Sequence, residues 1–330
     1  MKINNVRAST LNTYKDCEFK YWLIHQCEAE DQTGFKAILG TIIHWVAEIL
    51  AKSKKNNHYK LNSKINDFNI LLKIAYSRFR KDYPHHQWNE EIDIAFCKKQ
   101  IEYIINSPFN PLKCNILDIE KQFEISLNKI GFALPGGEYL KLRGTMDRID
   151  LIDQDTIHII DYKSGKRLNW DTGTSKELEH FEKDIQFRIY NLAASIIYPK
   201  YKYRIFTVLY PQDGGPYSFS IDDSDKPKIL DIIRRDYNNI YLNDKPSRLI
   251  DDNLRKREHF KCRYVCSFGK NGLCDKYFNL LKKERFAKAT EKIQQISISM
   301  KRVKISARND YSNNKIVKIN LIGKDNDSPI

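Results

Sequence analysis

The chain has 330 residues, 41% of them hydrophobic, which is enough for one large domain or two moderate ones with a buried core. Its net charge of +14 indicates a polyanionic partner, and nucleic acid is favoured over a membrane because the sequence has no amphipathic basic anchor and no lipidation motif. No apolar stretch is long enough for a transmembrane helix and the N-terminus lacks a signal-peptide core, so we expect a cytoplasmic protein with reduced thiols.

The first part of the chain predicts two amphipathic helices. One covers residues 9–27 and contains Cys17, which on its own is typical of a small buried apolar residue. The other runs from about residue 34 to 52, and His44 lies beside its apolar stripe. His44 is either a core histidine with a satisfied hydrogen bond or a ligand of a metal or phosphate. Gly40, four residues before it, would let this helix approach another backbone closely.

Residues 53–110 are expected to be helical and polar, with aromatic side chains interleaved with basic ones. Such a mixture predicts either a surface that stacks bases and holds phosphates or a solvated face over an ordinary core. The adjacent His85 and His86 have no acidic or cysteine partner at ligand spacing, so we assign no metal site to them. The proline-containing run from Ser107 to Pro111 marks a boundary.

Three strands follow, and the last two form the central feature of the sequence. Residues 116–127 alternate as a strand that contains Glu120, and a turn is expected at residues 134–137. Residues 140–152 and 156–163 are rich in apolar β-branched residues and are joined by a tight Asp-Gln-Asp turn. They predict an antiparallel hairpin.

Charged residues interrupt the second strand of this hairpin and predict a metal site. Because side chains alternate along a strand, Asp161 and Lys163 point to one face and Tyr162 points to the other. Together with Asp147 from the first strand, they offer two carboxylates to a hard divalent cation such as Mg²⁺. Lys163 could orient or deprotonate a metal-bound water, or stabilise charge on phosphate. The alternative is a surface hairpin with an ordinary ion pair.

The segment after this hairpin predicts the rest of a mixed α/β sheet. A polar stretch leads to a helix at about residues 178–197, on which Gln186 and Tyr190 share one face because they are four residues apart. The elements expected after it are strands at residues 203–210 and 217–221 and a helix at about 226–243. Strands followed by a helix and a further strand favour a mixed sheet with flanking helices.

Three cysteines near the C-terminus predict a metal or cluster site. Cys262, Cys266 and Cys274 lie within thirteen residues and follow the basic run Arg255-Lys256-Arg257. Three thiolates leave one position open on a tetrahedral Zn²⁺ or on a four-iron cluster. The candidates for the fourth ligand are Cys17, Cys27, Cys97 and Cys114.

These patterns divide the chain into four regions. Residues 1–111 form a helical N-terminal region, residues 112–225 form the core sheet and helix, and residues 226–281 form a C-terminal helix with the cysteines. Residues 282–330 are a basic tail, in which 316–322 is a candidate edge strand or docking segment. The sequence contains no internal repeat, Walker A loop or helicase motif, so no ATP-driven motor is expected within it.

Four short motifs occur in order on the predicted elements: Gly40-x₃-His44, Gly144-x₂-Asp147-Arg148, Asp161-Tyr162-Lys163 and Gln186-x₃-Tyr190. Together they resemble the PD-(D/E)XK nuclease superfamily, specifically its RecB-like branch, over about residues 9–280. The resemblance implies a mixed central sheet of the restriction-endonuclease-like type, flanked by helices. A helical N-terminal region and a cysteine-stapled C-terminal region would complete the fold.

The same resemblance implies a catalytic site that uses Mg²⁺ or Mn²⁺. The residues it implies as metal ligands are His44, Asp147, Asp161 and the carbonyl group of Tyr162. Lys163 resembles the lysine that acts on the attacking water. Gln186 and Tyr190 resemble the residues that support the DNA and the geometry of the site.

The Ser-x-Leu-x₂-Tyr-x₂-Cys run from Ser9 to Cys17 resembles the iron–sulphur members of that branch, which include AddB-type recombination nucleases and CRISPR-adaptation nucleases. The ligands that this resemblance implies for a four-iron, four-sulphur cluster are Cys17, Cys262, Cys266 and Cys274. The gaps between the last three are longer than is usual in these proteins, and Zn²⁺ is the alternative. Either group would join the two ends of the chain.

On this basis we expect a metal-dependent DNA nuclease, acting as an exonuclease or end-processing enzyme on single-stranded DNA in recombination, repair or phage DNA metabolism. A protein partner in a recombination or replication complex is expected, and a membrane is not. The alternatives are a structure-specific endonuclease and a non-catalytic DNA-binding module on a nuclease fold.

Overall fold

A computed structural model describes residues 5–32, 34–57, 67–127, 140–168, 173–249 and 261–311. Three sequence predictions lie outside these residues: the turn at 134–137, the basic run at 255–257 and the apolar segment at 316–322. Among the helices in these stretches, none is both long and apolar enough to cross a membrane.

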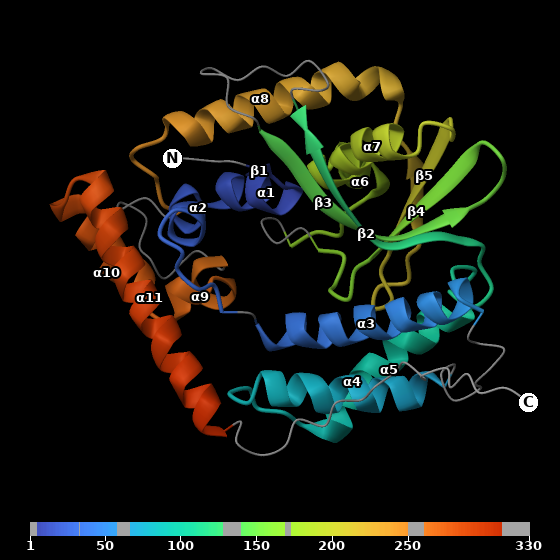
Figure 1. The fold of residues 1–330 in the computed structure, drawn as a ribbon, viewed down its shortest axis with the longest axis horizontal. Coiled ribbons are helices and arrows are strands. Elements are labelled where there is room, and N and C mark those ends of the chain that lie inside the picture. The colour runs from blue at the N-terminus through green and yellow to red at the C-terminus, as the bar shows by residue number, and fades with distance from the viewer. Residues whose placement is uncertain are drawn as a thin grey trace, which may run out of the picture.

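A six-stranded mixed sheet lies at the centre of the structure (Figure 1). Its strands are β1 (Asn5–Val6), β2 (Ile116–Ser126), β3 (Lys141–Leu151), β4 (Thr156–Tyr162), β5 (Tyr203–Leu209) and β6 (Tyr217–Ser220). The order is β1-β3-β4-β5-β6, and β2 also pairs with β3. The pairs β1–β3 and β4–β5 are parallel, and the others are antiparallel. This mixed sheet with flanking helices confirms the predicted fold class.

The predicted hairpin is present as β3 and β4. The two strands pair in antiparallel register from Arg148 opposite Ile160 to Leu151 opposite Ile157. Every residue of β4 is buried, because the strand has a neighbour on each edge and its side chains join two apolar clusters. A carboxylate at the end of such a strand, as at Asp161, therefore lies in a largely dehydrated position.

One edge of β3 is shared between two short partners. β1 pairs with Lys141 and Leu142, and β4 pairs with residues 148–151, while β2 runs along the opposite edge. Within the described stretches, no strand pairs with residues 143–147 on the β1 and β4 side. Backbone groups of this central part of β3 are therefore available to side chains from other elements.

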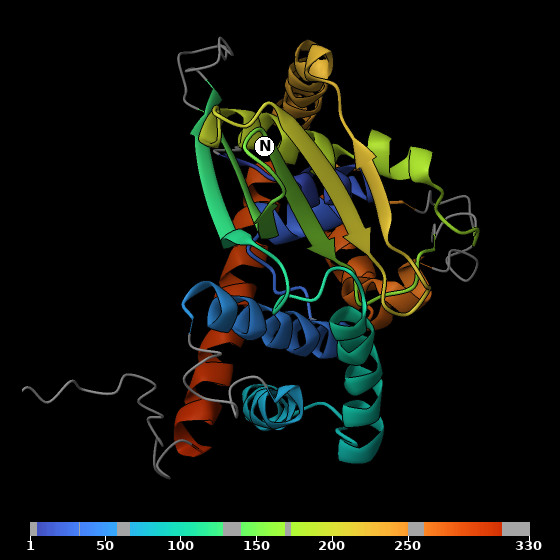
Figure 2. The same ribbon diagram turned by 90° about the vertical axis from the view of Figure 1, so that its right-hand side faces the viewer.

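Helices cover one face of the sheet and the ends of its central strands (Figures 1 and 2). Helices α1 (Ala8–Asp16), α7 (Ile185–Ile197) and α8 (Lys226–Leu242) contribute to the largest apolar cluster with the sheet. Helices α3 (Phe35–Lys55), α4 (Phe68–Asp82) and α5 (Glu90–Asn106) form a second cluster. Ile160, Tyr162 and Leu209 join this second cluster, so the three helices pack on the C-terminal ends of β4 and β5.

Two of the predicted helices are each broken into two shorter ones. The helix expected at residues 9–27 is α1 and α2 (Glu18–His25), because Cys17 is extended, with φ −164° and ψ 107°, and caps α2 through its sulphur. The helix expected at residues 178–197 is α6 (Leu178–Lys183) and α7. Asp184 separates them and caps α7 by accepting a hydrogen bond from the Gln186 backbone N–H at 2.9 Å. Both breaks place a motif residue in the first turn of a helix or at its cap.

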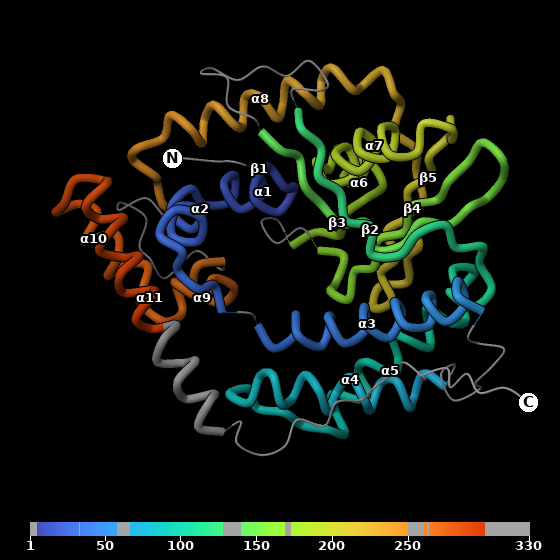
Figure 3. The backbone as a smooth tube through the Cα atoms, in the orientation of Figure 1, coloured from blue at the N-terminus to red at the C-terminus, as the bar shows by residue number. Residues whose placement is uncertain are grey.

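The two ends of the described chain pack side by side (Figure 3). Elements near the C-terminus are a π-turn (Lys261–Val265), α9 (Ser267–Lys270), α10 (Leu273–Lys283) and α11 (Phe286–Tyr311), and a 3₁₀ turn (Asp223–Asp225) precedes α8. Helices α2, α9, α10 and α11 share a third apolar cluster, in which Trp22 is fully buried and its indole N–H donates to Thr290 Oγ1 at 3.2 Å. The sequence analysis did not predict α11.

Candidate active site

Asp147 and Asp161 lie where β3 and β4 stop pairing. The ladder ends at Arg148 and Ile160, so the two aspartates are the next residues on their strands. In place of a ladder bond, the backbone N–H of Tyr162 donates to Asp147 Oδ2 at 2.9 Å. This bond turns the Asp147 carboxylate toward the end of β4 and draws it close to Asp161.

Lys163 lies beside Asp161 at the end of β4. Its Nζ is 2.7 Å from Asp161 Oδ2 and donates to Gln186 Oε1 at 3.3 Å. Burial lowers the pKa of Lys163, but Asp161 and Asp147 more than offset this effect and hold the pKa above its ordinary value. The amine therefore carries a positive charge at neutral pH.

Gln186 and Tyr190, one turn apart on α7, connect Asp161 to β3. Gln186 Nε2 donates to Asp161 Oδ1 at 2.7 Å and to the Tyr190 hydroxyl at 2.9 Å. The Tyr190 hydroxyl donates to the carbonyl of Thr145 at 2.5 Å, in the part of β3 that has no strand partner on this edge. This chain of hydrogen bonds fixes the orientation of the carboxamide and of Asp161.

Gly144 leaves space for the ring of Phe123, which packs against Tyr190. A Cβ atom at Gly144 would lie 2.4 Å from the ring of Phe123, and that ring packs edge-on against Tyr190 with a centroid distance of 6.2 Å. The glycine of the Gly-x₂-Asp motif is therefore explained by ring packing on the face of β3 that leads to the site.

Helix α3 brings His44 to the same place. His44 Nδ1 is 3.5 Å from Asp147 Oδ2. One turn earlier, a Cβ atom at Gly40 would lie 2.3 Å from Oγ of Ser164, the residue after Lys163. The close approach expected at Gly40 therefore occurs, and it is made to a side chain.

Glu120 belongs to this group, and the sequence analysis assigned it no role. The pairs Ile119–Arg148 and Lys121–Met146 on either side of it place Glu120 opposite Asp147. Its φ of 47° is uncommon for a residue with a Cβ atom and marks a local distortion of β2. The only signal in the sequence was a carboxylate inside a strand pattern, and no pattern could predict the cross-strand register.

His44, Glu120 and Asp147 offer ligand atoms that lie within 4.8 Å of one another. Burial and then Asp147 raise the pKa of Glu120 to about 7, and burial and then Asp161 raise the pKa of Asp147 to about 6. Such shifts indicate negative charge that is not fully compensated. An imidazole and two carboxylates fit Mn²⁺ or Mg²⁺. Asp161, in contrast, already contacts Lys163 and Gln186 through its two oxygens.

The ring of Tyr162 packs edge-on against His44, with a centroid distance of 5.9 Å, and its hydroxyl reaches a buried polar network. Its hydroxyl accepts a hydrogen bond from Arg148 at 2.6 Å, and Arg148 also donates to the carbonyl of Phe109 at 2.8 Å and to Asp150 at 2.9 Å. Arg148 is only 1% exposed. The arginine of the second motif thus attaches the end of β4 to the segment that leads into β2.

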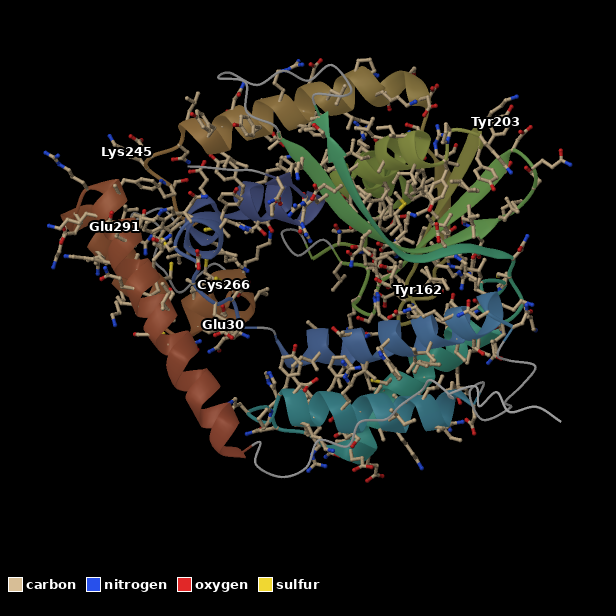
Figure 4. All side chains as sticks on the ribbon, in the orientation of Figure 1. Glu30, Tyr162, Tyr203, Lys245, Cys266 and Glu291 are labelled. Atoms are coloured by element: carbon tan, nitrogen blue, oxygen red, sulfur yellow. The ribbon has the colours of Figure 1, made fainter. Side chains whose placement is uncertain are left out.

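Cys17, Cys266 and Cys274 pack against the same apolar cluster of α2, α9, α10 and α11. Burial, together with the charges of Cys17 and Cys266, raises the pKa of Cys262 to about 11. Burial likewise raises the pKa of Cys274 to about 12, with smaller contributions from Cys17 and Cys266. Gly269 is needed here, because its Cβ would lie 2.1 Å from the carbonyl oxygen of Cys262. Figure 4 shows Cys266 near α2.

The other three cysteines have different surroundings. Cys27 is fully buried in the apolar cluster of α2, α9, α10 and α11, Cys97 lies 3.8 Å from the carbonyl of Leu39, and Cys114 contacts Arg148. Polar contacts hold the cysteine region against the segments on either side of α2: Lys261 Nζ donates to Asp16 Oδ1 at 3.2 Å, and Ser267 Oγ donates to Asp31 Oδ1 at 2.5 Å. Contacts of the protein itself thus join these two parts of the chain.

The chain belongs to the PD-(D/E)XK nuclease superfamily, whose family model matches residues 6–302. It is similar to one of the subunits of the ATP-dependent helicase/deoxyribonuclease from Streptococcus agalactiae (26% identical over 162 residues) and from Clostridium perfringens (25% over 187 residues). These matches cover 48% and 49% of this chain but 14% and 16% of the relatives. A candidate exonuclease from Eubacterium rectale has a structure with a TM-score of 0.47 and 14% sequence identity, over 77% of this chain and 88% of that one.

The superfamily predicted from the four motifs is therefore confirmed, and relatives of the RecB and AddB type match at low identity. The iron–sulphur branch and the roles of the individual site residues stay predictions.

The contact between Gly40 and Ser164 can be tested by a compensating pair of substitutions. We expect Gly40→Ala to lower the free energy of unfolding by about 1–3 kcal/mol, because the new methyl group would overlap Ser164 Oγ. Ser164→Ala in the same chain removes that oxygen and should recover most of the lost free energy of unfolding. Chemical unfolding measures both effects. Gly34→Ala, at a position with nothing within 4 Å, is the matched control, and an equally small effect at Gly40 would contradict the contact.

Proposed function

We propose that this chain is a Mg²⁺- or Mn²⁺-dependent deoxyribonuclease that hydrolyses phosphodiester bonds. The observation that carries the proposal is the convergence of Asp147, Asp161 and Lys163, from three positions in the sequence, in one site of a PD-(D/E)XK fold. The relatives from Streptococcus agalactiae and Clostridium perfringens are named as deoxyribonuclease subunits, and the charge of +14 favours a polyanionic substrate.

The protonation state of Lys163 bears on its role. Against the lowering effect of burial, Asp161 and Asp147 raise the pKa of Lys163 and favour its ammonium form, which orients water or stabilises charge. We assign it the stabilisation of negative charge on the phosphate and the orientation of the attacking water. Asp161 and Gln186 hold the ammonium group in place for this task.

The cation-binding group in this proposal is His44, Glu120 and Asp147, with Asp161 and the Tyr162 carbonyl beside it. A bound Mg²⁺ or Mn²⁺ would supply an activated water and neutralise charge on the phosphate. Asp147 is held for this purpose by the backbone N–H of Tyr162, and Glu120 by its position opposite Asp147.

The proposed substrate is single-stranded DNA, attacked from an end as an exonuclease or end-processing enzyme would attack it. The basis is the resemblance of the Ser9 to Cys17 run and of the four motifs to end-processing nucleases. A structure-specific endonuclease is the alternative. A closed single-stranded circle discriminates between them, because an exonuclease leaves it intact. A module that only binds DNA is disfavoured by the complete set of Asp147, Asp161 and Lys163.

We further propose that Cys17, Cys262, Cys266 and Cys274 hold a four-iron, four-sulphur cluster, with Zn²⁺ as the alternative. Four thiols are the kind of donor set that either group needs, since each ligand must lose its proton. Burial raises the pKa of Cys17, and backbone N–H groups oppose that shift, including the N–H of Lys20 at 3.4 Å from the sulphur.

The relatives carry the name of an ATP-dependent helicase/deoxyribonuclease of which they are one part. We propose by analogy that this chain acts with a protein partner that moves or unwinds DNA in recombination, repair or phage DNA metabolism, in the cytoplasm.

The catalytic assignment is tested with Asp161→Asn and Lys163→Met. We expect each substitution to reduce cleavage of end-labelled single-stranded DNA by roughly 100-fold or more, because the negative charge of the transition state is no longer stabilised. DNA binding should stay largely intact. Lys98→Met, on the surface of α5 with 47% exposure, is the control. Full cleavage by purified Asp161→Asn would rule out this mechanism.

The role of Glu120 is tested by metal binding. We expect Glu120→Gln to weaken Mn²⁺ binding by roughly tenfold in calorimetry, because one of two charged ligands is lost. Glu124→Gln is the control on the same strand, since Glu124 is exposed and pairs with Lys141. Unchanged Mn²⁺ affinity in Glu120→Gln would contradict this role and indicate that Asp161 is the second carboxylate ligand.

The cysteine group is tested by colour and metal content after anaerobic purification. We expect a brown protein with about four irons per chain and absorption near roughly 400 nm. Cys17→Ala should lose the iron and the absorption. Cys27→Ala should keep the iron and the absorption, because Cys27 packs in the same apolar cluster without a ligand role. A colourless wild-type protein with one zinc per chain would contradict the cluster.

A further inference from the structure

A pocket of about 450 Å³ lies between α1, α6, the start of α7 and α8. Among the residues that line it, those with a basic side chain are Lys15, Lys176, His180, Lys183 and Arg235. They come from three helices and from the segment before α6, so the pocket collects positive charge from distant parts of the sequence. The pocket belongs to neither the metal-binding group nor the cysteine region.

The acidic residues of the pocket are already engaged. Asp184 caps α7 by accepting from the Gln186 backbone, and Glu179 pairs with Lys183 on the next turn of α6. Lys15 and Arg235 both pair with Asp236, at 2.8 and 3.2 Å. Lys176, in contrast, is half-buried and forms no ion pair with any residue in the described part of the chain. A half-buried ammonium group without a counter-charge favours the approach of an anion.

The pocket is connected to the active site by the chain on two sides. Lys183 and Asp184 lie three and two residues before Gln186, whose carboxamide contacts Asp161 and Lys163. Lys176 lies thirteen residues after Lys163, and its backbone N–H donates to the carbonyl of Arg167 at 2.9 Å. A ligand in the pocket would therefore lie against the same helix start that carries Gln186.

We propose that this pocket binds a backbone phosphate of the DNA strand whose scissile bond lies at Lys163, a few nucleotides away from that bond. The inference rests on the proposed deoxyribonuclease function and adds a second phosphate contact to it. A phosphodiester carries one negative charge. Ammonium and guanidinium groups can bind its oxygens whichever way the strand is turned. Contacts of this kind set the position of a strand without reading its sequence.

The test compares long and short substrates in the full chain. Lys176→Ala with Arg235→Ala removes two cations of the pocket and leaves every residue of the active site unchanged. Lys228→Ala is the matched control on α8, where Lys228 is 73% exposed and pairs with Asp225. Cleavage is measured on single strands of ~30 and ~4 nucleotides, the shorter of which is too short to span both sites.

We expect the double variant to raise KM for the long strand by roughly fivefold to tenfold, and to lower the salt dependence of its binding by about 0.7 per lost phosphate contact. Cleavage of the short strand should not change, and the control should match the wild type. An equal loss on both substrates would show damage to the active site and overturn the proposal, as would no loss on either.

Two further measurements separate the neighbouring explanations. The first measurement compares how tightly the long strand binds to Lys163→Met and to Lys163→Met that also carries the two pocket substitutions. Binding needs no cleavage, so weaker binding by the second protein would support the pocket even if the nuclease assignment failed. Equal binding by these two chains would overturn the pocket alone. Inorganic phosphate is the second probe: if the pocket substitutions abolish its inhibition of short-strand cleavage but leave long-strand binding unchanged, the pocket takes a free anion and the strand assignment is wrong.

Discussion

The separation of β3 from β4 at Asp147 and Asp161 is the constraint on which the arrangement of the site depends. If the ladder continued, backbone atoms would occupy the space into which Tyr190 reaches for the Thr145 carbonyl, and the Tyr162 N–H would not be free for Asp147. The short strand β1 pairs with the same edge of β3 at Lys141 and Leu142. The sheet is therefore continuous on both sides of an opening in its middle. The residues predicted to be catalytic therefore occupy a gap in the hydrogen bonding of a buried sheet rather than its outer end.

Keeping two strands apart inside a core requires compensation, and Arg148 supplies it from the other face. Its ion pair with Asp150 is almost fully buried, with side chains 1% and 4% exposed, and it also binds Tyr162 and the Phe109 carbonyl. Breaking such a pair by removing one partner generally costs about 3–5 kcal/mol, because a buried charge is left alone. The arginine after the metal-binding aspartate and the tyrosine between Asp161 and Lys163 thus form one structural unit that fixes where β4 ends.

The sequence predicted the residues whose chemistry lies on a regular strand or helix pattern. It did not predict the contacts between segments that are distant in the sequence. The hairpin, its charged end and the Gln186 and Tyr190 pair follow from alternation along a strand and from the helical repeat. Glu120 did not follow, because its place opposite Asp147 depends on a cross-strand register and on a backbone angle of 47°. The break at Cys17 was missed because apolar periodicity continues across it, while the extended backbone there is set by the cap on α2. Helix α11 was missed because its buried side, Ala289 and Ile293, is narrow and its surroundings are basic.

The electrostatics of the site bear on the proposed function of a strongly basic protein. Glu120, Asp147 and Asp161 stand against His44 and Lys163, and burial with neighbouring carboxylates raises the pKa of Glu120 to about 7 and that of Asp147 to about 6. Under the proposed function, a phosphodiester would be repelled from three carboxylates unless a divalent cation bound first. Attraction of the strand would then have to come from positive groups outside this cluster. A nuclease with carboxylates at its reacting centre would in this way separate the charges that bind the strand from the charges that act on the bond.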